Sequence, residues 1–124
     1  MPEAVIVSAL RTPIGTAKKG TLRDTDAYAL ADHVVRAAAE ELAGYGSTIP
    51  VDDVILGEGL YGGGVIARHA AITAGLTTVP GASVNRHCAA GQAAVQNAPT
   101  RTARTHRTWT CRSRSAGTPR SRPG

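Results

Sequence analysis

The sequence predicts a protein of the α/β class, in which short buried strands alternate with helices. Continuous runs of apolar, β-branched residues at 3–10 and 51–59 indicate strands. Apolar residues at helical spacing indicate helices at 25–44 and 65–76. A weaker strand at 81–87 and a helix of small residues at 89–98 complete a β-α-β-α-β-α order. That order favours a parallel layer of strands connected by right-handed crossovers.

The first element is the run EAVIVSAL at 3–10. Its unbroken apolar character is typical of a strand that is buried on both faces of a parallel sheet. Pro13 and Gly15 end the run, because proline has no N–H for a ladder and glycine permits a turn. We therefore expect a buried strand followed by a polar, basic loop at 16–23.

The second element is a helix. Apolar residues recur every three or four positions from Ala27 to Leu42, and Gly44 provides a stop. Asp24 or Thr25 is the expected N-cap. His33 lies on the polar face of this helix and has no partner at a ligand spacing, so we expect it to be solvated rather than bound to a metal.

The remaining elements become progressively richer in small residues. VDDVILGEG at 51–59 predicts a second strand, followed by a glycine-rich turn and the helix VIARHAAITAGL at 65–76, which ends near Gly75. GASVNRH at 81–87 predicts a third strand. The last helix, AAGQAAVQNA at 89–98, has almost no bulky side chain, so its stability must come from close approach to neighbours on several sides.

Charge divides the chain into two parts. Residues 1–98 contain seven basic and nine acidic residues, a net charge of −2, whereas residues 99–124 contain seven arginines and no acid, a net charge of +7. The second part has no Leu, Ile, Val or Met, and it cannot offset roughly 1–2 kcal/mol of backbone entropy per residue. We therefore predict a partial domain at 1–98 and a disordered basic tail at 99–124.

Two interpretations of the tail remain open. Dispersed arginines can neutralise phosphates, which would make the tail a nucleic-acid-binding arm. Alternatively, an excess of Arg, Thr, Pro and Ser is what a GC-rich coding strand yields when it is read out of frame. Shifting the triplets of TCRSRSAG at 110–117 by one base permits an apolar run that ends in Gly-Gly, so a frameshift after residue 98 is the interpretation that we favour.

The cysteine count excludes two classes of protein. Cys88 and Cys111 are 23 positions apart and give neither a disulfide framework nor paired zinc ligands. The apolar run near the N-terminus is too short, and too acidic at its start, for a signal peptide. No stretch of the sequence approaches the length of a membrane span. We therefore expect a cytoplasmic protein with no metal site and no membrane partner.

Cys88 is the candidate catalytic residue. It lies where the third strand meets the third helix, and a cysteine in the first turn of a helix meets unpaired backbone N–H groups and the positive end of the helix dipole. Both favour the nucleophilic thiolate, and the same amides can receive an oxyanion. Taken alone, a cysteine at such a junction is also compatible with a small buried hydrophobic residue.

The residues around Cys88 extend this hypothesis. SVNRHCAAGQAAV resembles the nucleophile segment of the thiolases, in which Asn-Arg or Asn-Lys, one further residue, the reactive cysteine and a small-small-Gly run open a buried helix. EAVIVSALRTPIG resembles the first strand and turn of that family, VDDVILGEGL the second strand, and ARHAAITAGL the following helix. These four matches occur in the right order and cover residues 3–98.

The resemblance implies acyl transfer to or from coenzyme A, as in fatty acid metabolism and β-oxidation. Cys88 matches the cysteine that takes the acyl group as a thioester, and coenzyme A and acyl-CoA are substrates rather than tightly bound cofactors. Arg86 and His87 are expected to be positional. Thiolases are homo-oligomers whose subunits contain two similar halves, and this chain would cover part of one half.

The chain departs from the family's pattern in its other catalytic motifs. The family's activating histidine lies in a Gly-His-Pro motif, and none of His33, His69, His87 and His106 has that context. Cys111 is followed by Arg-Ser and does not match the family's Cys-x-Gly motif, and the Asn-Glu-Ala-Phe segment is absent. We therefore expect this chain alone, about the first quarter of a thiolase, to be inactive in the complete reaction.

Two other functions have partial support in the sequence. Gly57, Gly59 and Gly62 match the spacing of a dinucleotide-binding turn, but no Asp or Glu follows Glu58 to hold a ribose. A nucleic-acid binder would act through the arginine tail, yet the rest of the chain is slightly acidic and the tail's aromatic content is Trp109 alone. We therefore expect no nucleic-acid partner.

Overall fold

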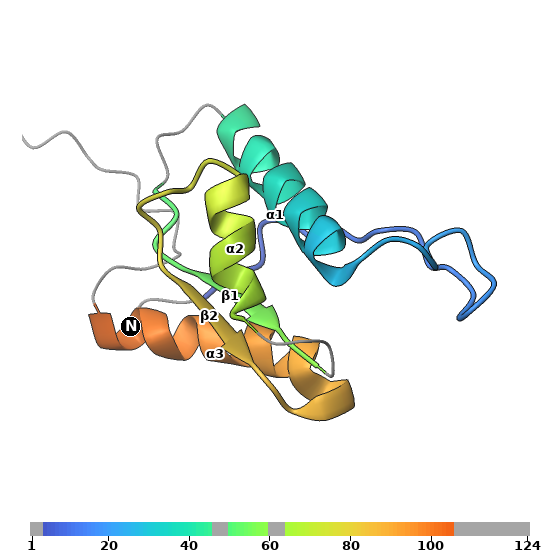
Figure 1. The fold of residues 1–124 in the computed structure, drawn as a ribbon. Helices are drawn as coiled ribbons and strands as arrows, with labels where there is room; N and C mark the ends of the chain where they lie inside the picture. The colour runs from blue at the N-terminus through green and yellow to red at the C-terminus, as the bar shows by residue number, and fades with distance from the viewer. Residues whose placement is uncertain (1–3, 46–49, 60–63, 106–124) are drawn as a thin grey trace, which may run out of the picture.

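The computed structural model describes residues 4–45, 50–59 and 64–105. Within them helices alternate with strands, which confirms the α/β class (Figure 1). The elements are α1 (Ala27–Gly44), β1 (Val54–Gly57), α2 (Ile66–Thr73), β2 (Gly81–Val84), the 3-10 turn η1 (His87–Ala89) and α3 (Ala90–Thr105).

The two strands pair in parallel, as expected for strands joined by a crossover helix. Val54 lies opposite Gly81, and Gly57 lies opposite Val84. The pairing continues beyond β1, because the N–H of Glu58 donates to the carbonyl of Val84 at 2.9 Å. Parallel strands end at the same edge of a sheet, so the segments that follow β1 and β2 begin side by side.

Helices cover both faces of the strand pair, with α2 on one face and α3 on the other (Figure 1). Side chains alternate between the faces along each strand. Ser83 faces α2, where its Oγ accepts a hydrogen bond from the N–H of Ala67 at 3.4 Å. Gly57 faces α3. The longer helix α1 packs against α2, on the side of the sheet away from α3.

Small residues build the core between α1, α2 and the strands. The alanines of α2 at positions 67, 70 and 71 have no exposed surface, and they let the α1 and β2 backbones come close. A methyl group at Gly81 would lie 2.4 Å from the backbone nitrogen of Arg68. The buried cluster consists of Val35, Val54, Ala67, Ala70, Ala71 and Val79.

On the other face, β1 crosses the start of α3 at a distance that only glycine permits. A Cβ atom at Gly57 would lie 2.5 Å from the backbone nitrogen of Gly91 and 2.6 Å from the carbonyl carbon of Ala90. Both neighbours are backbone atoms, which cannot move aside as a flexible side chain would. The small-residue helix therefore has the close neighbour that its composition requires.

The helix α1 begins two residues later than the sequence predicts. Asp26, rather than Asp24 or Thr25, is the N-cap: its backbone is extended and its Oδ1 accepts from the N–H of Ala29 at 2.7 Å. This is the bond by which an N-cap carboxylate satisfies an otherwise unpaired amide. Gly44 is the last helical residue rather than the residue beyond the end.

The predicted strand at 3–10 is wrong for the residues that the structure describes. Residues 4–10 form no strand, and Val5, Ile6 and Val7 are at least half exposed. A strand needs a ladder partner, and within the described ranges β1 pairs with β2 and no further strand. The apolar run therefore has the composition of a two-sided buried strand without the second layer that would bury it.

Polar contacts connect this N-terminal segment to the end of α1. Ser8 donates a hydrogen bond to Glu41, which also accepts a hydrogen bond from the Tyr45 hydroxyl at 3.1 Å. The bond to Glu41, together with the negative charge of that carboxylate, raises the pKa of Tyr45. The hydrogen bond from Ser8 therefore joins this segment to α1, and no strand ladder holds residues 4–10.

The helix α3 continues past the predicted end of the domain at residue 98. It runs to Thr105 and includes Pro99, which has no N–H for the helical ladder. Thr100 donates its hydroxyl to the carbonyl of Gln96 at 3.3 Å. Residues 99–105 are therefore helical rather than disordered, whereas residues 106–124 lie outside the described part of the chain.

The N-terminus of α2 is capped by the side chain of Glu58, the residue that follows β1. Val65, the residue before the helix, has a left-handed backbone (φ 56°) and makes no capping bond. Glu58 supplies the cap instead, because its Oε2 accepts from the N–H of Ile66 at 3.1 Å. A carboxylate at this end of a helix also interacts favourably with the helix dipole.

We predict that Gly57→Ala destabilises the fold by about 1–3 kcal/mol, because its methyl group overpacks the backbone of α3. Gly91→Ala is the matched control on the other side of the crossing, where nothing lies within 4 Å of the added Cβ. Gly91→Ala is expected to stabilise α3 by up to about 1 kcal/mol. Urea unfolding followed by circular dichroism measures both, and equal effects would contradict the described crossing.

We predict that Glu58→Ala lowers the free energy of unfolding by about 0.5–2 kcal/mol, the usual cost of losing a helix cap. Glu58→Gln keeps an oxygen acceptor for the N–H of Ile66 and is expected to lose less. Amide hydrogen exchange in α2 reports the effect directly. If the alanine and glutamine variants exchanged alike at Ile66, the capping role of Glu58 would be wrong.

Candidate active site

The site predicted around Cys88 lies at the carboxyl edge of the strand pair. β2 ends at Val84, and the chain then passes through η1 into α3. The loop that leaves β1 begins at Glu58 beside Val84, because the two are joined by a backbone hydrogen bond. The carboxyl edge of a parallel sheet is where α/β proteins generally place their ligand sites, so the fold brings the predicted cysteine to a favourable location.

A short polar turn holds the chain between β2 and α3. Asn85 Oδ1 accepts a hydrogen bond from the N–H of His87 at 2.9 Å, an interaction typical of Asx turns. His87 has a left-handed backbone with φ of 49°. The N–H of Ala89 then donates to the carbonyl of Arg86 at 3.0 Å and closes the 3-10 turn. These contacts reverse the chain within five residues.

Cys88 lies in this 3-10 turn, directly before α3, rather than in the first turn of an α-helix as predicted. The 3-10 turn runs directly into α3, as such turns often do at helix N-termini. Cys88 is exposed, as are Asn85, Arg86 and His87 beside it. The sulfur is therefore open to a reagent or substrate, and the alternative of a buried small hydrophobic residue does not describe it.

The amides of the turn are less open than the sequence predicts. The N–H of His87 is taken by Asn85, that of Ala89 by Arg86, and that of Ala90 by His87. A 3-10 turn closes bonds between residues three apart, which uses N–H groups that an isolated helix end would leave unpaired. What the turn offers an acyl thioester is an accessible sulfur at the start of a helix.

Two side chains order the loops at the two ends of β2: Asn85 at its exit and Arg68 at its entry. Asn85 Nδ2 also donates to the carbonyl of Gly59 at 3.5 Å, a longer contact that links the exits of β1 and β2. Arg68 donates to the carbonyls of Val79 at 2.6 Å and Thr77 at 3.0 Å, which fixes the loop that enters β2. An arginine on a helix gives no sequence signal that its partners are distant carbonyls.

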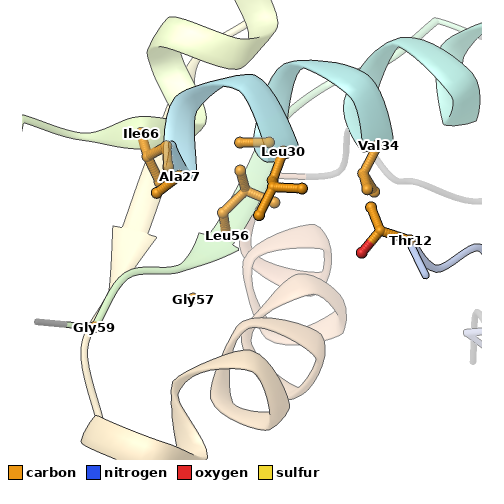
Figure 2. A pocket seen from close by; sticks show the side chains of 9 residues that line it. Thr12, Ala27, Leu30, Val34, Leu56, Gly57, Gly59 and Ile66 are labelled. Carbon is orange, nitrogen blue, oxygen red and sulfur yellow. The ribbon is translucent and has the colours of Figure 1, made fainter. Parts of the chain in front are cut away.

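A hollow of about 320 Å³ lies on the α1 side of β1 and does not include Cys88 (Figure 2). Figure 2 shows Leu30 and Val34 of α1 directed toward Leu56 of β1 and toward Thr12. The hollow is open and mostly apolar, so it lacks the convergent polar groups of a typical ligand site. Its walls are Thr12, Ala27, Leu30, Ala31, Val34, Leu56, Gly57, Gly59 and Ile66.

The structure gives no support to a dinucleotide site at the glycine-rich turn. Such a site needs free N–H groups at the following helix N-terminus to hold the phosphates. Here the carboxylate of Glu58 already accepts the N–H of Ile66 at that position. Gly57 serves the crossing with α3, and Gly62 lies outside the described residues.

The two other histidines in the described ranges, His33 and His69, belong to α1 and α2. His33 is exposed on α1, as predicted. His69 of α2 instead contacts α1, with its Nε2 3.5 Å from Asp32 Oδ2 and its ring edge-on to Tyr28. Across residues 4–45, 50–59 and 64–105, no three His, Cys, Asp or Glu side chains are close enough to hold a metal ion.

None of the helices in the described ranges is both long enough and apolar enough to cross a bilayer. His106 and Cys111 lie outside those ranges.

Comparison with known proteins assigns the fold to a family. The model of the thiolase N-terminal domain matches residues 4–106, which contain every element described above. A 3-ketoacyl-CoA thiolase of Bacillus subtilis is 40% identical over 99 residues, 73% of this chain and 24% of the relative. A 3-ketoacyl-CoA thiolase of Citrobacter koseri is 35% identical over 102 residues, 79% of this chain and 26% of the relative.

The chain therefore spans about a quarter of the length of these curated relatives. The matched region extends past residue 98 to the end of α3, in agreement with the helix observed there. Because the thiolase N-terminal family model matches residues 4–106 and these relatives are 35–40% identical over about 100 residues, this chain belongs to the thiolase family.

Proposed function

We propose that this chain carries the acyl-accepting step of a thiolase-type acyltransferase, with Cys88 as the nucleophile. One observation carries the proposal: Cys88 is exposed in a held turn at the carboxyl edge of the strand pair, inside the region that matches the thiolase N-terminal domain. Family membership supports acyl transfer as the reaction class, and the turn supplies an accessible sulfur.

In the proposed step, the Cys88 thiolate attacks the carbonyl carbon of an acyl-CoA. A carbon–sulfur bond to Cys88 forms, the bond to the sulfur of coenzyme A breaks, and coenzyme A leaves as its thiolate. The product is an acyl-cysteine thioester, so one thioester is exchanged for another without an oxidant or reductant. Coenzyme A acts here as the leaving group and carrier, not as a bound cofactor.

The complete reaction would pass the acyl group from Cys88 to the carbanion of acetyl-CoA, or back to coenzyme A. That half requires an acid/base group, and none of the four histidines lies between Gly and Pro as in the family's motif. His87, the nearest to Cys88 in sequence, has its N–H held by Asn85 and an exposed side chain. We therefore propose acyl acceptance without turnover for this chain, acting on soluble acyl-CoA in the cytoplasm.

We predict that incubation with acetyl-CoA acylates Cys88 in preference to Cys111. Intact mass followed by peptide mapping locates the acyl group. Cys88→Ser is the control, because it replaces the thiol by a hydroxyl of similar size. Repeating the incubation in urea tests whether the preference needs the folded turn.

Preferential labelling of Cys88 that disappears in urea is the expected result. Equal labelling of both cysteines in the folded chain, or a preference that persists in urea, would show that the turn does not activate Cys88.

A further inference from the structure

The turn that carries Cys88 is fixed at both ends. At its start, Val84 is held in the strand pair opposite Gly57. At its end, Ala90 and Gly91 lie against Gly57 at the crossing of β1 and α3. Residues 85–89 must therefore connect two fixed points, and the conformation of this short segment decides where the Cys88 sulfur lies.

That conformation includes an unfavourable backbone at His87. Its φ of 49° lies in the left-handed region, which side chains other than glycine adopt only at a cost. His87 is exposed, so packing of its own side chain does not compensate. Some other interaction must hold residue 87 in the left-handed region.

The Asn85 carboxamide makes that interaction. Its Oδ1 accepts the N–H of His87 at 2.9 Å, so it contacts the strained residue directly. Its Nδ2 donates to the carbonyl of Gly59 at 3.5 Å, which connects the turn to the segment that follows β1. One side chain therefore connects the strained residue with both strand ends, although it is itself exposed.

We propose that Asn85 is a positioning residue for Cys88: its carboxamide holds His87 in the left-handed conformation and so places the cysteine in its turn. Asn85 acts through His87 and touches neither the sulfur nor a substrate. The proposal rests on the proposed function in one respect, that Cys88 is the residue whose position matters.

The test measures the alkylation rate of Cys88 by iodoacetamide, with Cys111 of the same chain as the internal reference. Losing a hydrogen bond of ordinary strength allows His87 to leave the left-handed region, so we expect Asn85→Ala to lower the Cys88/Cys111 rate ratio by about two- to tenfold. Gln92→Ala is the matched control, because Gln92 is exposed on the first turn of α3 and is expected to leave the ratio unchanged.

A second variant identifies the mechanism. Glycine adopts the left-handed region without steric cost, so residue 87 no longer needs Asn85 in a His87→Gly background. In that background we expect Asn85→Ala to change the Cys88/Cys111 rate ratio by less than about twofold, because glycine at position 87 stays in the left-handed region without the hydrogen bond. Amide hydrogen exchange at residue 87 should accelerate in Asn85→Ala and stay slow in Asn85→Asp, which keeps the acceptor oxygen.

Three results would overturn the proposal: an unchanged or raised ratio in Asn85→Ala, an equal loss in the His87→Gly background, or lost exchange protection throughout α2. The last would make Asn85 a residue of general stability. These readouts do not use acyl-CoA, so failure of acetyl transfer with the Asn85–His87 coupling intact would overturn the proposed function alone.

Discussion

The crossing of β1 over the start of α3 is the contact on which the rest of the structure depends. Gly57 brings a strand backbone against the backbone of Ala90 and Gly91, with no room for a side chain between them. Dispersion contacts and excluded water act over this short distance, which is how a helix of alanine, glycine and glutamine gains stability without bulky residues. On the opposite face, Gly81 and the buried alanines of α2 likewise allow the backbones of β2 and α2 to pack closely.

Fixing the start of α3 also fixes the candidate site. The parallel pairing places the exits of β1 and β2 side by side, and the crossing sets where the helix after β2 must begin. Glu58 follows β1 and caps α2, whereas Asn85 follows β2 and accepts the N–H of His87 in the turn of Cys88. The geometry at the cysteine thus follows from backbone contacts of small residues, and polar side chains refine it.

The elements with strong local patterns were predictable from the sequence. The apolar run at 51–59 located β1, the weaker pattern at 81–87 located β2, helical spacing located α1 and α2, and the residues around Cys88 identified the family. The run at 3–10 was wrongly expected to form a strand, because pairing depends on a neighbour that its own residues do not specify. The 3-10 turn, the left-handed His87 and the cap from Glu58 were also missed, since each depends on individual hydrogen bonds that leave no periodic pattern in the sequence. The change of composition after residue 98 suggested that the ordered part of the chain ends there, whereas α3 continues to Thr105.

The most direct measurement of the crossing is a nuclear Overhauser effect between the Hα protons of Gly57 and the amide proton of Gly91 in the isotopically labelled chain. We expect a strong cross-peak between these protons, together with cross-peaks between β1 and β2. Strand cross-peaks without any signal between Gly57 and the start of α3 would show that the helix does not rest on the strand, and the position assigned to Cys88 would then have no support.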